Sequence, residues 1–196
     1  MNFLAHIYLS GENNQIKIGN FIADAIRGNN YKGYATTIQK GIFFHRKIDT
    51  FTDSHATVKI SKRRLHERYR HYDGVIIDVL YDHFLAKNWA SYSQLPLDEY
   101  AQEFYSLLNS NFDILPEKVQ NFLPYMIKDD WLNNYRTIEG IEKVLIGLNK
   151  RTKNKSQMYL AIEDLKLHYT EFDNDFTTFF KDLQQFCLEE LKTITT

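Results

Sequence analysis

Apolar residues recur three and four positions apart along most of the chain. The spacing is clearest in Ile16–Arg27, Tyr34–Asp49 and Ile138–Leu148, where it places the apolar side chains on one face of a helix. Val75–Trp89 is apolar on most faces, which predicts a central helix. No run shows the alternation of apolar and polar residues expected of a half-buried strand. The pattern predicts an all-α protein of roughly eight to ten helices.

Capping residues and helix breakers predict where these helices end. Gly28 would end the first, Asp53 would cap a helix that runs to about Tyr72, and Asp73-Gly74 would separate that helix from the next. Further helices are expected over Leu97–Leu108, from Pro116 to about Trp131 with a kink at Pro124, and onward to Leu191, with a polar hinge at Thr152–Ser156. We expect a single compact domain over residues 1–196.

Composition narrows the class of protein. Hydrophobic residues make up 43% and charged residues 25%, as in ordinary globular proteins. The net charge of −1 argues against a protein that is basic all over and coats nucleic acid. The single cysteine, Cys187, excludes an internal disulfide and a cysteine-based zinc cluster. With no signal-peptide pattern and no apolar run near the ~20 residues of a membrane span, we expect a soluble, cytoplasmic protein.

Histidine and aspartate are concentrated in the first 83 residues. Four aspartates occupy apolar or tightly patterned segments there: Asp24, Asp49, Asp78 and Asp82. His45 and Asp49 are four apart on one predicted helix, and so are Asp78 and Asp82 on the most apolar one, next to His83. Buried carboxylates are costly unless paired or bound to metal. Nitrogen and oxygen ligands without sulfur suit Mn²⁺, Fe or Zn²⁺, and carboxylate-rich sites favour Mn²⁺ or Mg²⁺.

Each of these residues also has a structural interpretation. A His–Asp pair one turn apart is often a surface pair, Asp78 could bind Arg46 or Arg70, and His6 could be a hydrogen-bonded core histidine. The coincidence of so many such residues in one stretch favours a metal centre.

The predicted helix from Asp53 to Tyr72 is strongly basic. Between Ala56 and Tyr72 it holds six Lys and Arg residues and one Glu, a net charge of +5. Such a run is often only a solvated face. Because this one directly precedes the helix with Asp78 and Asp82, it also fits a site for a phosphorylated or acidic substrate.

Four motifs stand in order within residues 1–89. They are Met1–His6, Gly19-Asn20-Phe21 through Asp24 to Arg27-Gly28, Gly41–Asp49 with Thr52-Asp53, and Asp78–Leu85 with Trp89. Together they resemble the acyl carrier protein phosphodiesterases, also called acyl carrier protein hydrolases. The resemblance is dense over residues 1–89 and fades afterwards, so we expect residues 97–196 to supply mainly packing helices.

The resemblance implies a fold, a reaction and a cofactor. Family members remove 4′-phosphopantetheine from the serine of holo-acyl carrier protein. This reaction would place the protein in fatty acid biosynthesis. They depend on Mn²⁺ and are distant relatives of the helical HD phosphohydrolases, so an HD-like fold is expected. The order of ligand residues differs from that of HD enzymes, because Asp82 precedes His83 here. Individual ligand roles therefore cannot be copied from HD enzymes.

Within this interpretation, the expected metal ligands are Asp24, His45, Asp82 and His83, with Mn²⁺ as the cofactor and Mg²⁺ or Fe as alternatives. Asp49 and Asp78 would be further ligands or carboxylates that orient the imidazoles. Arg46 would contact the phosphate, and His6 would act as the acid for the leaving serine oxygen or have a structural role. The acidic acyl carrier protein would dock on a basic strip formed by Lys59, Lys62, Arg63, Arg64 and Arg70.

Two other functions fit parts of the pattern. An HD-like hydrolase of a nucleotide or other small phosphoester would keep the metal and change the substrate. A helical module that binds nucleic acid through the basic helix would leave the aspartates without a purpose. We therefore expect acyl carrier protein as the partner, with no nucleic acid and no membrane.

Overall fold

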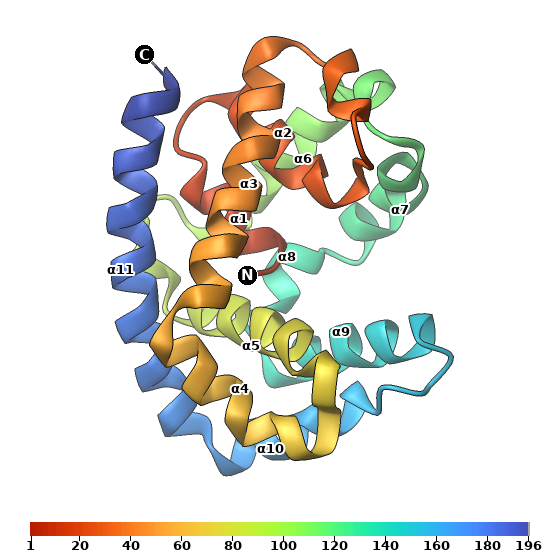
Figure 1. Cartoon of the computed structure of the whole chain (residues 1–196). Coiled ribbons are helices and arrows are strands. Elements are labelled where there is room, and N and C mark those ends of the chain that lie inside the picture. The colour runs from red at the N-terminus through yellow and green to blue at the C-terminus, as the bar shows by residue number, and fades with distance from the viewer. Residues whose placement is uncertain (196) are drawn as a thin grey trace.

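The computed structural model describes residues 1–195, and over that range it contains eleven α-helices and no strand (Figure 1). The prediction of an all-α fold is confirmed. The helices are α1 (Phe3–Leu9), α2 (Asn14–Ile22), α3 (Thr36–Ser54), α4 (Ala56–Tyr69), α5 (Asp73–Lys87), α6 (Leu97–Ser110), α7 (Glu117–Lys128), α8 (Trp131–Asn134), α9 (Ile138–Arg151), α10 (Ala161–Leu167) and α11 (Tyr169–Thr195).

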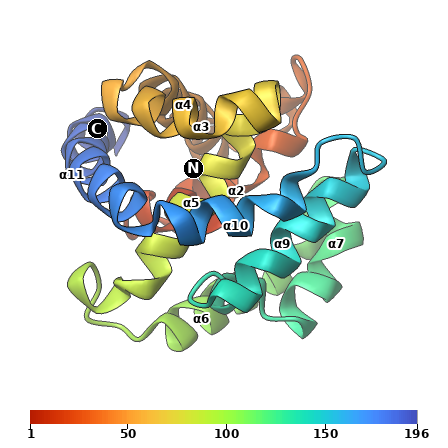
Figure 2. The same cartoon turned by 90° about the horizontal axis from the view of Figure 1, so that it is seen from below.

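Helix α5 lies at the centre of the fold, as its apolar sequence predicts. Its residues from Val79 to Ala86 are all buried. Helices α1, α4, α9 and α11 pack against it, and Figures 1 and 2 show it enclosed by these neighbours. The long helix α11 runs beside α3, α4 and α5 and closes one side of the core.

Two glycines let α2 and α3 cross at very close range. A Cβ atom on Gly19 would lie 2.1 Å from the carbonyl oxygen of Ile38, and one on Gly41 would lie 2.3 Å from that of Ile16. Both distances are far inside van der Waals contact, so only glycine fits at either position. This crossing brings Asn20, next to Gly19, against His45, four residues after Gly41.

Several predicted helix boundaries are wrong. The helix predicted over Ile16–Arg27 corresponds to α2, which ends at Ile22 rather than near Gly28 and is followed by the 3-10 turn η1 (Ala23–Ala25). Helix α3 continues through Asp53, whose side chain binds Lys62 at 2.7 Å instead of capping a helix. The cap of α4 is His55, whose ring accepts a hydrogen bond from the Thr57 amide.

Two later features agree with the sequence prediction, and the end of α4 differs from it. The predicted hinge is found, since α9 ends at Arg151 and the next helical turn begins at Met158. Pro124 lies within α7, as expected. Helix α4 ends earlier than predicted, at Tyr69, where Arg70 adopts a positive φ of 50°. Among the helices of residues 1–195, none combines the length and apolar character needed to span a membrane.

Candidate metal centre

Two histidines and two aspartates meet where α1, α2 and α3 converge. The ring nitrogens of His6 and His45 and a carboxylate oxygen of Asp49 all lie within 4.8 Å of one another. Nε2 of His45 is 3.1 Å from Asp49 Oδ2 and 3.2 Å from Asp24 Oδ1, and Nε2 of His6 is 3.3 Å from Asp49 Oδ1. The two imidazoles stack with their centroids 4.0 Å apart. We call His6, His45 and Asp49 the metal triad.

Asn20 sets the orientation of both imidazoles. Its amide nitrogen donates to the carbonyl oxygen of His6 at 2.9 Å and to Ser10 Oγ at 2.8 Å. Its Oδ1 therefore faces Nδ1 of His6 at 2.8 Å and Nδ1 of His45 at 3.1 Å. Because an amide oxygen only accepts, both Nδ1 atoms carry a proton, and either ring, when neutral, turns the lone pair of Nε2 toward Asp49.

This arrangement fits a bound cation. Nε2 of His6 is buried and has no hydrogen-bond partner. A lone pair that faces a carboxylate is electrostatically unfavourable unless a positive charge lies between them. Metal-ligating histidines are commonly held through the other ring nitrogen, as Asn20 holds these two. The residues therefore fit a divalent cation that accepts mixed nitrogen and oxygen ligands.

The pKa values of His6, His45 and Asp24 describe the charges that a cation would meet. Burial, together with the neighbouring His45, lowers the pKa of His6 to about 4. Burial acts to lower the pKa of His45 as well, but hydrogen bonds to Asp24 and Asp49 outweigh it and raise that pKa to about 9. The hydrogen bond from His45 lowers the pKa of the Asp24 carboxyl. Near neutral pH and without metal, Nε2 of His45 thus carries a proton that faces Asp24 and Asp49, and a bound metal would displace that proton.

Asp82 lies outside the metal triad and has a different role. It is 0% exposed, and its carboxylate accepts hydrogen bonds from the amides of Asn2 (3.2 Å), Leu4 (2.8 Å) and Ala5 (3.3 Å). These are amides at the start of α1 that have no partner within the helix. Burial raises the pKa of Asp82 to about 7, although these donors oppose the shift. The Asp82 carboxylate thus binds the start of α1 and lies apart from His6, His45 and Asp49.

His83 is likewise engaged elsewhere. Its Nδ1 donates to the carbonyl oxygen of Tyr135 at 2.7 Å, so its Nε2 accepts from the Tyr169 hydroxyl at 2.7 Å. With both ring nitrogens occupied, His83 has no lone pair left for a metal. Of the expected ligands Asp24, His45, Asp82 and His83, only Asp24 and His45 contact each other in this group, and Asp82 and His83 each bind other partners.

The other predicted residues of the site are also spread out. Asp78 accepts a hydrogen bond from the Met1 amine at 2.7 Å. The exposed guanidinium of Arg46 lies over the rings of Tyr31 and Phe43, with its Cζ 5.8 and 5.4 Å from their centroids. Neither residue contacts the metal triad directly.

The predicted docking strip on α4 is divided by internal ion pairs. Lys59, Arg63 and Arg70 are exposed and form no ion pair within residues 1–195. Lys62 is bound to Asp53. Arg64 is partly buried, where it binds Asp175 and lies 5.5 Å from the ring centroid of Phe172.

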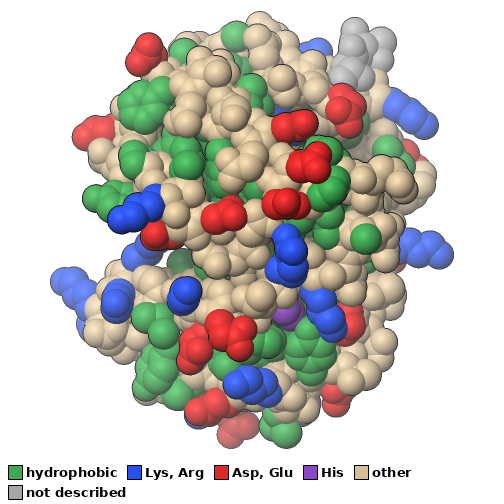
Figure 3. Space-filling view, turned by 180° about the vertical axis from the view of Figure 1, so that it is seen from behind, with side chains coloured by type: hydrophobic (Ala, Val, Ile, Leu, Met, Phe, Trp, Pro, Cys, Tyr) green, Lys and Arg blue, Asp and Glu red, His purple; other side chains and the backbone are tan. Residues whose placement is uncertain are grey.

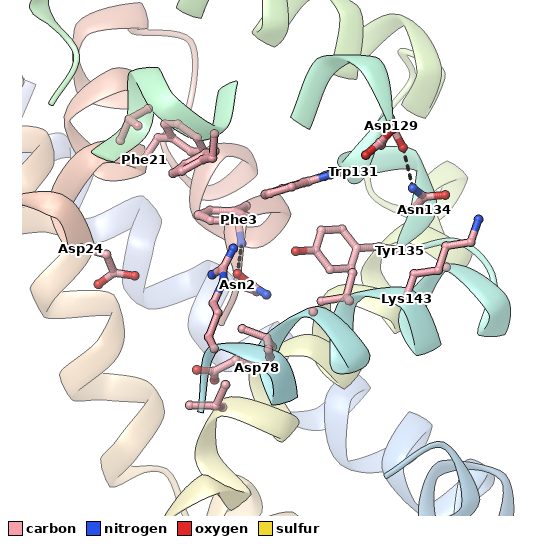
Figure 4. A pocket seen from close by; sticks show the side chains of 18 of the residues that line it. Asn2, Phe3, Phe21, Asp24, Asp78, Asp129, Trp131, Asn134, Tyr135 and Lys143 are labelled. Carbon is pink, nitrogen blue, oxygen red and sulfur yellow. Dashed lines mark hydrogen bonds between the residues drawn. The ribbon is translucent and has the colours of Figure 1, made fainter. Parts of the chain in front are cut away.

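A cavity of about 1040 Å³ reaches Asp24, which contacts His45 of the metal triad. Figure 4 shows Asp24 and Asp78 at one side of it, with Phe3, Trp131 and Tyr135 around it. Its far wall comes from α7, α8 and α9, and the surface in Figure 3 is hollowed in this region. The second half of the chain, expected mainly to pack, also forms a wall of this cavity.

Sequence reasoning missed two parts of the site. Asn20 belongs to a motif that the resemblance was based on, but its role as the acceptor for two histidines was not predicted. The available signal was a polar amide inside the apolar stretch from Ile18 to Ile22. The sequence suggests an acid or a structural role for His6, whereas the structure places it in a group of residues that could hold a metal ion.

The fold and the site together define an all-α protein with a histidine–aspartate candidate metal centre beside a large cavity. The family model for acyl carrier protein phosphodiesterase matches residues 1–183. The chain therefore belongs to the acyl carrier protein phosphodiesterase family, which confirms the resemblance.

Relatives that carry this name match over nearly the whole chain. The one from an Enterobacter species is 33% identical over 181 residues, which cover 92% of this chain and 94% of that protein. Those from Klebsiella pneumoniae and Yersinia pestis are 32% and 30% identical over 186 residues, covering 94% of this chain and 96% of each relative. No solved structure matches the chain.

Proposed function

We propose that this protein hydrolyses the phosphodiester that joins 4′-phosphopantetheine to a serine of holo-acyl carrier protein, which gives the apo form. The observation that carries the proposal is the metal triad, which lies beside a large cavity in a chain of the acyl carrier protein phosphodiesterase family. The names of the relatives supply the substrate.

His6, His45 and Asp49 would hold a divalent cation, and Asp24 would be a further ligand. We propose Mn²⁺, as the family implies, with Mg²⁺ or Fe as alternatives. When bound, the cation would neutralise charge on the phosphoryl oxygens and lower the pKa of a water molecule. His6 replaces Asp82 and His83 in this ligand set, because only His6 has a free, buried Nε2 that faces Asp49.

The protein side chains would position the reactants. Asn20 keeps both imidazoles in the tautomer that directs Nε2 toward the cation. The Asp24 side chain is 73% exposed and lines the cavity, so as a ligand it would hold the cation at the edge of the cavity, next to the phosphate. His6 is 3% exposed and would hold the cation, so we do not assign it the role of acid for the serine oxygen.

Docking of the acidic carrier protein would use the exposed cations of α4. Lys59, Arg63 and Arg70 are available for an acidic partner, whereas Lys62 and Arg64 are already paired. Such charges mainly raise the rate of association.

Hydrolysis of a small phosphoester such as a nucleotide is a second candidate, because the cavity has the size of a small-molecule site. A substrate panel separates the two functions. Holo-acyl carrier protein and a set of nucleotides are each incubated with the protein and Mn²⁺ or with chelator. The proposal expects loss of the phosphopantetheine mass from the carrier, abolished by chelator. Hydrolysis of nucleotides with an unchanged carrier mass would contradict it.

A further inference from the structure

Gly147 leaves space in the cavity, although the packing of its helix does not require a glycine there. It lies in the interior of α9 and lines the cavity, and a Cβ atom at this position would meet nothing within 4 Å. Gly140 on the same helix differs, because a Cβ there would lie 1.8 Å from the carbonyl oxygen of Asn134. Glycine inside a helix is destabilising relative to alanine. Neither a close contact nor a positive φ requires a glycine at position 147. The effect of Gly147 is to leave open space in the cavity.

Tyr135 offers an unused polar group to the same space. The residue is 2% exposed, and its hydroxyl points into the cavity (Figure 4). Among the described residues, none forms a hydrogen bond with this hydroxyl, although the Tyr135 carbonyl oxygen binds His83. The hydroxyl oxygen is not among the buried, unpartnered side-chain atoms of the described residues, so it is open to the cavity. Its orientation therefore makes it available to a ligand that donates or accepts a hydrogen bond within the cavity.

The remaining walls combine aromatic and polar surface. Phe3, Phe122 and Trp131 are half-buried and line it, with the rings of Phe122 and Trp131 stacked 5.7 Å apart. Asn2 and Asn134 place amide groups among them. Such a lining suits a flexible chain of methylene and amide groups better than a pure hydrocarbon.

The position of the cavity relative to the metal triad indicates what enters it. Asp24 both contacts His45 and lines the cavity. With the phosphorus at the triad, one substituent of the diester is a serine of the carrier protein, which stays outside. The other is the pantetheine arm, which needs space next to the phosphate.

We propose that the cavity between α1 and α9 binds the pantetheine arm of the substrate, with Gly147 leaving space for the chain and Tyr135 hydrogen bonding to it. This inference rests on the proposed function. It assigns substrate binding to helices α7 to α9.

The test places a larger side chain in the cavity at position 147. Gly147→Leu adds a side chain whose Cβ atom would meet nothing within 4 Å, and the control Glu142→Leu places the same side chain at an exposed position of α9 that does not line the cavity. Calorimetry measures the affinity for 4′-phosphopantetheine in the presence of Mn²⁺. We expect Gly147→Leu to weaken it about tenfold or more, and Glu142→Leu to leave it unchanged. Binding of Mn²⁺ alone and the melting temperature should not fall in either variant.

Tyr135→Phe provides an independent variant. It keeps the ring in the core and removes only the hydroxyl, so the affinity for 4′-phosphopantetheine should fall about fivefold. The KM for holo-acyl carrier protein should rise in parallel in Tyr135→Phe and Gly147→Leu. If the wild-type protein cleaves the carrier and both variants bind and cleave like it, the arm does not enter this cavity. If the wild-type protein releases no phosphopantetheine, the proposed function itself fails, and the inference fails with it.

Discussion

Asn20 and His45 lie on different helices, and Oδ1 of Asn20 accepts a hydrogen bond from Nδ1 of His45 at 3.1 Å. The same oxygen accepts from Nδ1 of His6 at 2.8 Å. One amide therefore fixes the tautomer of both imidazoles and directs both Nε2 atoms toward Asp49. The arrangement depends on the close crossing of α2 and α3 at Gly19 and Gly41.

Replacement of Asn20 should weaken metal binding without removing a ligand. In Asn20→Leu, the two imidazoles lose the acceptor that orients them, and we expect the Mn²⁺ affinity to fall about 10- to 100-fold. Titration calorimetry measures the effect. Ser10→Ala is the control, because Asn20 keeps its bond to the His6 carbonyl oxygen in that variant. Wild-type affinity in Asn20→Leu would refute this role for the amide.

Two aspartates that look alike in the sequence should respond differently. Asp49→Asn removes a charged ligand and should lower the Mn²⁺ affinity about tenfold or more. In Asp82→Asn, the side-chain oxygen can still accept hydrogen bonds from α1, so the affinity should stay within about twofold. Equilibrium dialysis of both variants gives the comparison. A greater loss in Asp82→Asn would restore the ligand role first predicted for that residue.

Metal binding should strengthen as the pH rises. The pKa of His45 is raised to about 9, so below that pH the metal must displace a proton. We expect the Mn²⁺ affinity to increase about tenfold per pH unit between pH 6 and 8. In the metal-free protein, the raised pKa contributes stability below pH 6.5 that is lost as the pH rises through about 9. An affinity independent of pH across this range would show that no such proton is displaced.

Charge reversal on α4 should separate docking from folding. Arg63 is exposed and unpaired among the described residues, so Arg63→Glu should raise the KM for holo-acyl carrier protein about three- to tenfold at low salt and leave kcat unchanged. Arg64→Glu should instead lower the melting temperature, because Arg64 is bound to Asp175. Lys181→Glu makes the same change at an exposed position of α11. An equal rise in KM for Lys181→Glu would mean that the effect is not local to α4.

The sequence predicted those features that depend on local spacing. Helical periodicity gave the all-α fold and the central position of α5, and it placed His45 and Asp49 on one face of α3. Asp82 could not be interpreted in this way, because its partners are backbone amides at the start of α1, about 80 residues away in the chain. A buried carboxylate with a helix terminus as partner and one with a metal have the same sequence pattern.

Partners that lie far away in the sequence also explain why the contacts of His83 and Arg64 could not be predicted. The partners of His83 are Tyr135 and Tyr169, and the partner of Arg64 is Asp175. All three partners come from the second half of the chain, where the sequence indicated only packing helices. Only the tertiary structure brings these residues together.

The most direct test compares two histidines during turnover. Holo-acyl carrier protein is incubated with Mn²⁺ and the wild-type protein, His45→Gln or His83→Gln, and the release of phosphopantetheine is followed by intact mass. His45→Gln should slow the release about 100-fold or more, whereas His83→Gln, whose amide can still bond to Tyr135 and Tyr169, should stay within about threefold of wild type. Fast release by His45→Gln together with slow release by His83→Gln would contradict the assignment of the metal triad as the catalytic centre.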